Sequence, residues 1–236
     1  MSCTALAPVG LSLVIGAFCG RAISVLPHSI HQDEPLTANL RAMLRWQGLE
    51  RRDWYEVIGL ALVSAAALAG LATAVPAMPW LFGFGIAIPV LLALAAIDYR
   101  AFLLPDLLIV VLGVTGLLLS LYAPLPGAGL PLAVIAGALG AGGLWLLRAY
   151  YRWRRNLDAL GFGDIKLMAA GGFWVGPAGL PWVILAGALL TLILAFCRSL
   201  LTGEKLTATT AAPLGFGLCL ALIGISVWIA VSGRPV

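Results

Sequence analysis

Residues 161–167 read Gly-Phe-Gly-Asp-Ile-Lys-Leu and place one carboxylate, Asp164, and one ammonium, Lys166, at the start of an apolar run. Charged side chains are costly at membrane depth, and those that occur there mostly face a bundle interior or a water-filled cavity. Asp164 is therefore a candidate functional residue. One carboxylate cannot serve as both acid and base, so a second is expected at a comparable depth, and Asp98 is the candidate.

Composition identifies an integral membrane protein. Of 236 residues, 62% are hydrophobic and only 10% are charged, which is far more apolar than a typical soluble domain. The basic residues are few and lie in short loops between apolar runs, so we expect no nucleic-acid partner. Residues 1–26 lack a basic n-region and contain Arg21, so we interpret them as a first membrane helix and not as a signal peptide.

The apolar runs predict about eight transmembrane helices. A bilayer core requires roughly 20 apolar residues as helix, and prolines and charges divide the chain into runs of that order. The predicted segments are approximately 5–26, 56–75, 79–97, 103–122, 129–149, 163–177, 180–200 and 213–232. The sixth is short and glycine-rich, and it begins at the 161–167 motif. The predicted fold class is an all-α polytopic membrane protein.

The positions of the basic residues predict orientation. They lie in or beside the loops that follow the first, third, fifth and seventh segments, whereas loops 75–78, 123–128 and 175–179 carry no charge. By the positive-inside rule the charged loops are cytoplasmic. Asp98 and Asp164 are then both at the cytoplasmic end of the bundle. In the first loop, residues 36–46 have the pattern of a short interfacial amphipathic helix.

The two aspartates occupy opposite kinds of helix end. Asp98 is predicted at a helix C-terminus and Asp164 at a helix N-terminus, which favours an anion by about 0.3–1 kcal/mol. If they meet, they should share a proton, with the charge on Asp164. That is aspartic protease chemistry, but a proton relay in a transporter fits the residues equally well. The structural alternatives are an interfacial ion pair for Asp98 and a helix N-cap for Asp164.

Four stretches, in the same order along the chain, resemble the type IV prepilin peptidases of type IV pili and type II secretion. Residues 159–170 are similar to that family's GxGD-x-K-L signature, and residues 98–106 to its first catalytic segment. Residues 212–217 resemble the motif that opens its last helix, and residues 16–27 its first-helix motif. The resemblance implies eight helices and a GxGD-type aspartic endopeptidase.

The same resemblance implies roles for particular residues. Asp98 and Asp164 would be the catalytic pair. The residues expected to support the motifs or bind substrate are Gly161, Gly163, Lys166, Pro105 and Pro213. Lys166 either contacts a substrate carbonyl or carboxylate or extends to the interface, and Asp106 is expected to favour the N-terminus of its helix. Residues 1–55 would form a first helix and cytoplasmic loop, and residues 56–236 the peptidase domain.

The chain departs from the family in its first cytoplasmic loop. Full-length members mostly carry two CxxC pairs there, thought to bind zinc, and residues 27–55 contain no cysteine. Cys3, Cys19, Cys197 and Cys219 lie singly, and His28 and His31 are interpreted as loop residues, so we expect no metal. The N-terminal region is associated with S-adenosylmethionine-dependent N-methylation. That cofactor and its activity are therefore in doubt, and proteolysis needs no cofactor.

The implied substrate is a prepilin or pseudopilin with a basic cytoplasmic leader and an apolar stem in the bilayer, cut after a glycine. The implied location is the bacterial inner membrane with the catalytic side cytoplasmic. The alternatives are a presenilin-like or preflagellin-type GxGD protease and a proton-coupled transporter. The sequence does not identify the pilin or secretion pathway, nor the oligomeric state.

Overall fold

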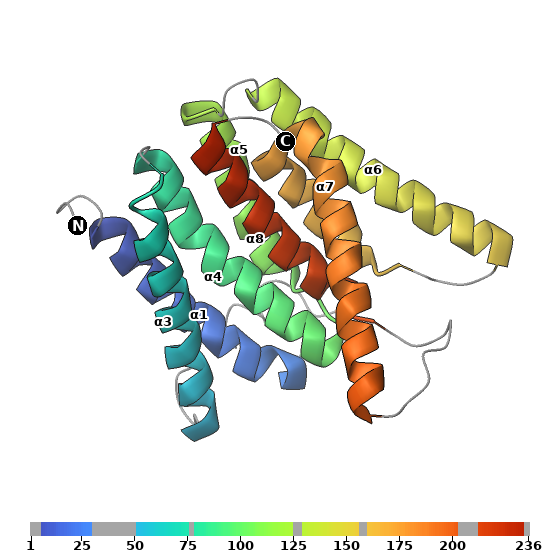
Figure 1. The fold of residues 1–236 in the computed structure, drawn as a ribbon, viewed down its shortest axis with the longest axis horizontal. Helices are drawn as coiled ribbons and strands as arrows, with labels where there is room; N and C mark the ends of the chain where they lie inside the picture. The colour runs from blue at the N-terminus through green and yellow to red at the C-terminus, as the bar shows by residue number, and fades with distance from the viewer. Residues whose placement is uncertain are drawn as a thin grey trace.

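The structure is a computed structural model that describes residues 6–29, 51–75, 78–124, 129–155, 160–202 and 212–233. Over these residues the chain forms helices and no strand, which confirms the predicted all-α class. The helices are α1 (Leu6–Ser29), α3 (Arg51–Leu71), α4 (Met78–Ala101), α5 (Asp106–Tyr122), α6 (Leu130–Arg155), α7 (Phe162–Thr202) and α8 (Leu214–Ser232). Figure 1 shows them as one bundle. The predicted interfacial helix at 36–46 and His31 lie outside the described residues.

Helix α4 is the centre of the bundle. It packs against α1, α3, α5 and α8, and most of its residues are buried although it contains Pro89. At the end of the bundle away from Asp98, Trp80 and Phe84 of α4 pack against Trp174 of α7, with ring centroids 5.8–6.2 Å apart. The indole of Trp174 donates to the carbonyl oxygen of Leu112 at 3.0 Å, so its polar atom is satisfied in the core. This cluster fixes one end of α4 and leaves the other to present Asp98.

Among the residues that the structure describes, five helices are long and apolar enough to cross a membrane: α1, α4, α6, α7 and α8. The apolar parts of α3 and α5, Tyr55–Leu71 and Asp106–Tyr122, are shorter. The chain is thus a multi-pass membrane protein. Several helices extend past their predicted segments into charged sequence, as α6 does to Arg155. Charges mark where a chain leaves the apolar layer, but they do not end backbone hydrogen bonding.

The sixth and seventh predicted segments, 163–177 and 180–200, are both helical and lie on the two sides of a sharp kink, with no loop between them. They form one element, α7, with a sharp kink at Gly176, whose backbone has φ 68° and ψ 180°. Pro177 follows and has no N–H to continue the helical ladder. Figure 1 shows the two parts of α7 folded back beside each other as a hairpin. The kink returns the chain towards the end of the bundle that carries Asp164.

Candidate active site

Asp98 lies in the last turn of α4 and is only 5% exposed. Its carboxylate accepts a hydrogen bond from the backbone N–H of Phe216 at 2.8 Å, and the N–H of Gly215 also interacts with it. Both donors belong to the first turn of α8. That helix begins after Pro213, which makes no side-chain cap. Asp98 therefore satisfies N–H groups that a helix N-terminus leaves without an intrahelical partner.

Asp164 lies in the first turn of α7 and is 7% exposed. It is the third helical residue, so it is not the N-cap that sequence reasoning offered as an alternative. Its carboxyl interacts with the backbone N–H of Gly161, just before the helix. This is the side chain to N-cap contact of a capping box. A Cβ on Gly161 would lie 3.1 Å from Asp164 Oδ2, so glycine leaves room for the carboxyl.

The structure brings the two aspartates to the same end of the bundle, where their carboxyls interact electrostatically. Leu104, in the loop between α4 and α5, packs between the start of α7, which carries Asp164, and the start of α8, which binds Asp98. Its side chain is within 2.9–3.0 Å of where a Cβ would be on Gly163 and on Gly215. These two glycines therefore permit α7 and α8 to approach the loop. The arrangement is a buried pair of carboxyls that can exchange a proton with a reacting group.

The electrostatic ranking inferred from helix ends is incomplete. Sequence placed Asp98 only at the C-terminus of its own helix. The structure adds the N-terminus of α8, whose N–H groups face the Asp98 carboxylate. Both aspartates thus lie at a helix N-terminus. The favourable field of a helix N-terminus, which was the reason for placing the charge on Asp164, therefore acts on Asp98 as well.

Lys166 pairs with Asp106, a contact that sequence reasoning did not predict. Its Nζ lies 2.8 Å and 2.7 Å from the two carboxylate oxygens of Asp106, and 5.2 Å from the ring centroid of Phe162. Arg148 of α6 faces the same ring at 5.9 Å. The pair connects the first residue of α5 to the beginning of α7. The sequence feature that could have predicted this ion pair is the presence of opposite charges at the starts of two neighbouring helices.

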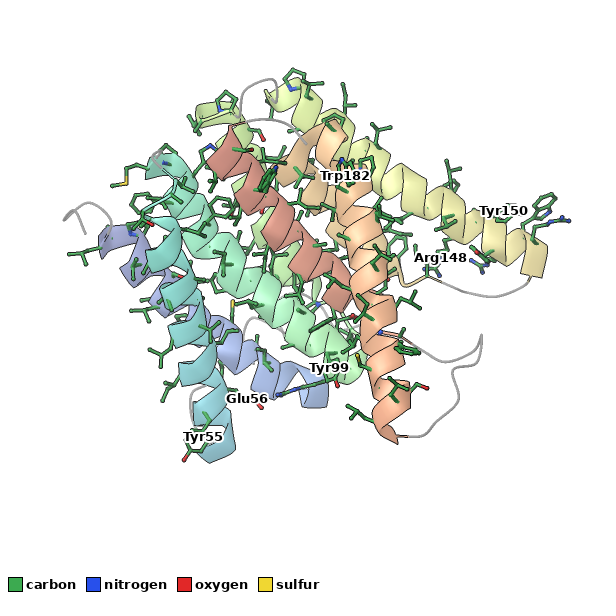
Figure 2. The ribbon with its side chains drawn as sticks, viewed as in Figure 1. Tyr55, Glu56, Tyr99, Arg148, Tyr150 and Trp182 are labelled. Carbon is green, nitrogen blue, oxygen red and sulfur yellow. The ribbon has the colours of Figure 1, made fainter. Side chains whose placement is uncertain are left out.

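The remaining motif residues set helix starts near the pair. Pro105 is the N-cap residue of α5, and Pro213 is that of α8. At the same end of α4, Arg100 forms an ion pair with Glu56 of α3 at 2.8 Å, and Figure 2 labels Glu56 on the lower part of that helix. The part of the chain that the structure describes holds no group of three or more potential metal-ligand side chains. The site is thus built from carboxyls, backbone N–H groups and close-packed glycines.

Comparison with known proteins points to one family. Residues 85–196, which contain both aspartates, match the type IV leader peptidase family. A prepilin leader peptidase/N-methyltransferase of Pectobacterium carotovorum subsp. carotovorum is 38% identical over 170 residues, covering 72% of this chain and 57% of that protein. The protein of the same name from Klebsiella pneumoniae is 40% identical over 134 residues, covering 56% of each.

A third relative with that name, from Burkholderia pseudomallei strain K96243, is 37% identical over 167 residues, covering 66% of this chain and 53% of that protein. The chain thus spans about half the length of the curated relatives it matches. No solved structure matches the chain significantly.

Proposed function

Because residues 85–196 match the type IV leader peptidase family, we propose that the protein is a membrane-embedded aspartic endopeptidase with Asp98 and Asp164 as its catalytic pair. Its substrates would be type IV prepilins or type II secretion pseudopilins, whose leader it would remove after a glycine. The observation that carries the proposal is the burial of two carboxyls, from separate helices, at one end of the bundle.

The proposed reaction uses the pair as acid and base. One carboxylate, ionised, takes a proton from a water molecule that attacks the scissile carbonyl, while the other, protonated, donates a hydrogen bond to the carbonyl oxygen. Backbone N–H groups from the start of α8 hold Asp98 in place. Gly161 does the same for Asp164 through its own N–H. The carboxyls are thereby oriented before substrate arrives, which is what positioned acid and base groups require.

We further propose that residues 56–236 form the peptidase domain and that residues 1–55 contribute the first helix and its loop. The charged ends of the helices would face the cytoplasm of a bacterial inner membrane. A presenilin-like or preflagellin-type peptidase would use the same pair on a different substrate. The absence of cysteine from residues 27–55 supports a peptidase without N-methyltransferase activity, and S-adenosylmethionine is then not required.

The test is cleavage of a prepilin-type substrate in membranes by the wild type and by Asp98→Asn and Asp164→Asn. We expect each substitution to lower the rate by at least about 100-fold, because each removes an acid or base group. The matched control is Asp106→Asn. Asp106 is 52% exposed, forms an ion pair with Lys166 and is not one of the two proposed catalytic aspartates. Cleavage that persists in both variants would refute the pair. Failure of the wild type on matched substrates, together with pH-driven flux, would favour a proton-coupled transporter.

Mass spectrometry of the product tests the second part of the proposal. Cleavage after glycine should leave a new N-terminus that carries an unmodified amine even when S-adenosylmethionine is supplied. A product heavier by one methyl group would show that methyltransferase activity persists. The cleavage result stands in either case, since proteolysis and methylation are read from different mass differences.

A further inference from the structure

A groove of about 570 Å³ lies beside the candidate site, between the end of α4 and the second half of α7. Tyr99, Arg100 and Phe102 line one wall, and Leu194, Cys197 and Arg198 line the other. The two aromatic side chains are each 48% exposed, and the Cys197 thiol is also exposed. The groove is therefore accessible, and its walls combine apolar side chains with two guanidinium groups.

The groove lies close to the carboxyl pair, because Tyr99 in its lining directly follows Asp98 in the chain. The ring of Tyr99 packs against that of Phe216, with centroids 5.8 Å apart, and Phe216 is the residue whose N–H binds Asp98. Figure 2 labels Tyr99 at the lower end of α4, beside α7. A chain lying in the groove would thus have one end next to Asp98.

The shape of the groove follows from where two helices end. Helix α8 packs against both α4 and α7, but it begins only at Leu214. Phe102, with φ 52°, ends α4 in a left-handed conformation, and the chain then turns to Leu104 beside the site. Since a phenylalanine with positive φ is uncommon, packing must hold this turn, which leaves the Phe102 side chain in the groove.

We propose that this groove binds the apolar stem of the substrate on the membrane side of the scissile bond, and not its basic leader; the proposal rests on the proposed function. Arg100 keeps 43% of its side chain exposed while it pairs with Glu56, and Arg198 lies on the opposite wall. None of the described residues that line the groove is acidic, so the groove offers no opposite charge to a basic leader. The leucine and aromatic walls favour apolar side chains instead. The leader then extends from the other side of the carboxyl pair.

Cys197 provides a direct test in the full-length protein. Cys19 and Cys219 are buried, whereas Cys197 is exposed. A Cys3→Ser substitution therefore leaves Cys197 as the reactive thiol. Asp164→Asn retains bound substrate by preventing cleavage. Prepilin-type substrates carrying single cysteines on either side of the scissile glycine are then joined to Cys197 with a short bis-maleimide. We expect crosslinks to stem positions and none to leader positions.

The matched control moves the thiol by one residue, with Cys197→Ser and Phe196→Cys. Phe196 is 54% exposed but does not line the groove. Equal crosslinking from both positions would mean non-specific contact along the outer face of α7 and would overturn the proposal. So would crosslinks to leader positions, or none at all. If the wild type nonetheless cleaves the same substrates, the proposed function survives and only the groove assignment fails.

A kinetic experiment separates the stem from lipid as the occupant. Cys197→Trp fills the groove and should raise KM by about tenfold with little change in kcat, because it removes substrate binding and not chemistry. Phe196→Trp should change neither constant. An unchanged KM in Cys197→Trp, with reduced labelling by a photoactivatable anionic phospholipid, would assign the groove to lipid and overturn the proposal.

Discussion

Gly215 lies where the first turn of α8 passes the carboxyl of Asp98. A Cβ at this position would come within 2.9 Å of Asp98 Cγ and Oδ2, closer than such atoms normally approach. Either the helix or the carboxyl would have to move. Because the N–H of the next residue binds the same carboxyl, a shift of α8 would also disturb that hydrogen bond. The absence of a side chain is thus a requirement of the site.

We predict that Gly215→Ala lowers the cleavage rate by about 10- to 100-fold, because displacement of a catalytic group by about 1 Å can cost that much. Gly224→Ala in the same helix is the control, since a Cβ there meets nothing within 4 Å. Cleavage rates of the two purified variants, compared at equal amounts of folded protein, check the prediction. Equal rates would mean that Asp98 tolerates the shift.

At the scale of elements, α7 reverses direction at Gly176 and so brings its second half back beside the site. The residue has φ 68° and ψ 180°, a backbone region that is essentially restricted to glycine. The first half of α7 carries Asp164, whereas the second carries Cys197 and Arg198 of the groove. The conformation of Gly176 therefore sets how the groove residues on the second half of α7 lie relative to Asp164 on the first half.

Gly176→Ala should reduce the free energy of unfolding by about 1–3 kcal/mol, the cost of a strained conformation for a residue with a Cβ. Gly142→Ala in α6 should be neutral or stabilise by up to about 1 kcal/mol, because it replaces a helical glycine where a Cβ meets nothing within 4 Å. Denaturant unfolding in detergent micelles measures both. A loss no greater than that of the α6 variant would contradict a strained kink.

The pairing of Lys166 with Asp106 joins the starts of two helices around Leu104. Both side chains are substantially exposed, at 39% and 52%, so the pair is expected to contribute at most about 1 kcal/mol. Asp106→Asn should accordingly slow cleavage by no more than about fivefold. Cleavage assays at low and high ionic strength check this, because screening should bring the variant and the wild type together. A loss that is independent of salt would indicate that Asp106 acts by another route.

At the scale of the whole molecule, both aspartates and the groove lie at one end, and the aromatic cluster around Trp174 lies at the other. Glu56, near the start of α3, pairs with Arg100 at the end of the bundle that carries the site. Thr73 follows the other end of α3 and is exposed. The loops at the end away from the site contain no charge in the sequence. By the positive-inside rule we expect the site to lie at the cytoplasmic surface, as the proposed function requires.

We predict that a thiol at Thr73→Cys, in a Cys3→Ser, Cys197→Ser background, reacts with a membrane-impermeant maleimide in intact spheroplasts. Native Cys197, in a Cys3→Ser protein, should react only after permeabilisation. Gel-shift labelling of the two proteins provides the comparison, and each serves as the other's control. The reverse pattern would place the carboxyl pair on the outer surface and contradict the proposed location.

Much of this architecture could be predicted because it depends on local composition. Apolar runs bounded by charges and prolines predicted the helices, and the structure confirms the all-α membrane fold. The positions of Asp98 near a helix end and of Asp164 near a helix start also followed from neighbouring residues. The abrupt reversal at Gly176, with no loop between the two helical parts of α7, did not, since a glycine and a proline in an uncharged turn are equally compatible with a longer loop.

The sequence by itself determined which residues are apolar enough to be helical in a membrane and which few carboxylates such a bundle must bury. Only the tertiary structure decided what those carboxylates meet. The N-cap residue of α8, Pro213, provides no capping side chain, and Asp98, more than a hundred residues away, accepts a hydrogen bond from an N–H of the first turn instead. The Lys166 pair and the groove arise in the same way, because hydrogen bonds and close contacts form between surfaces that only packing places together.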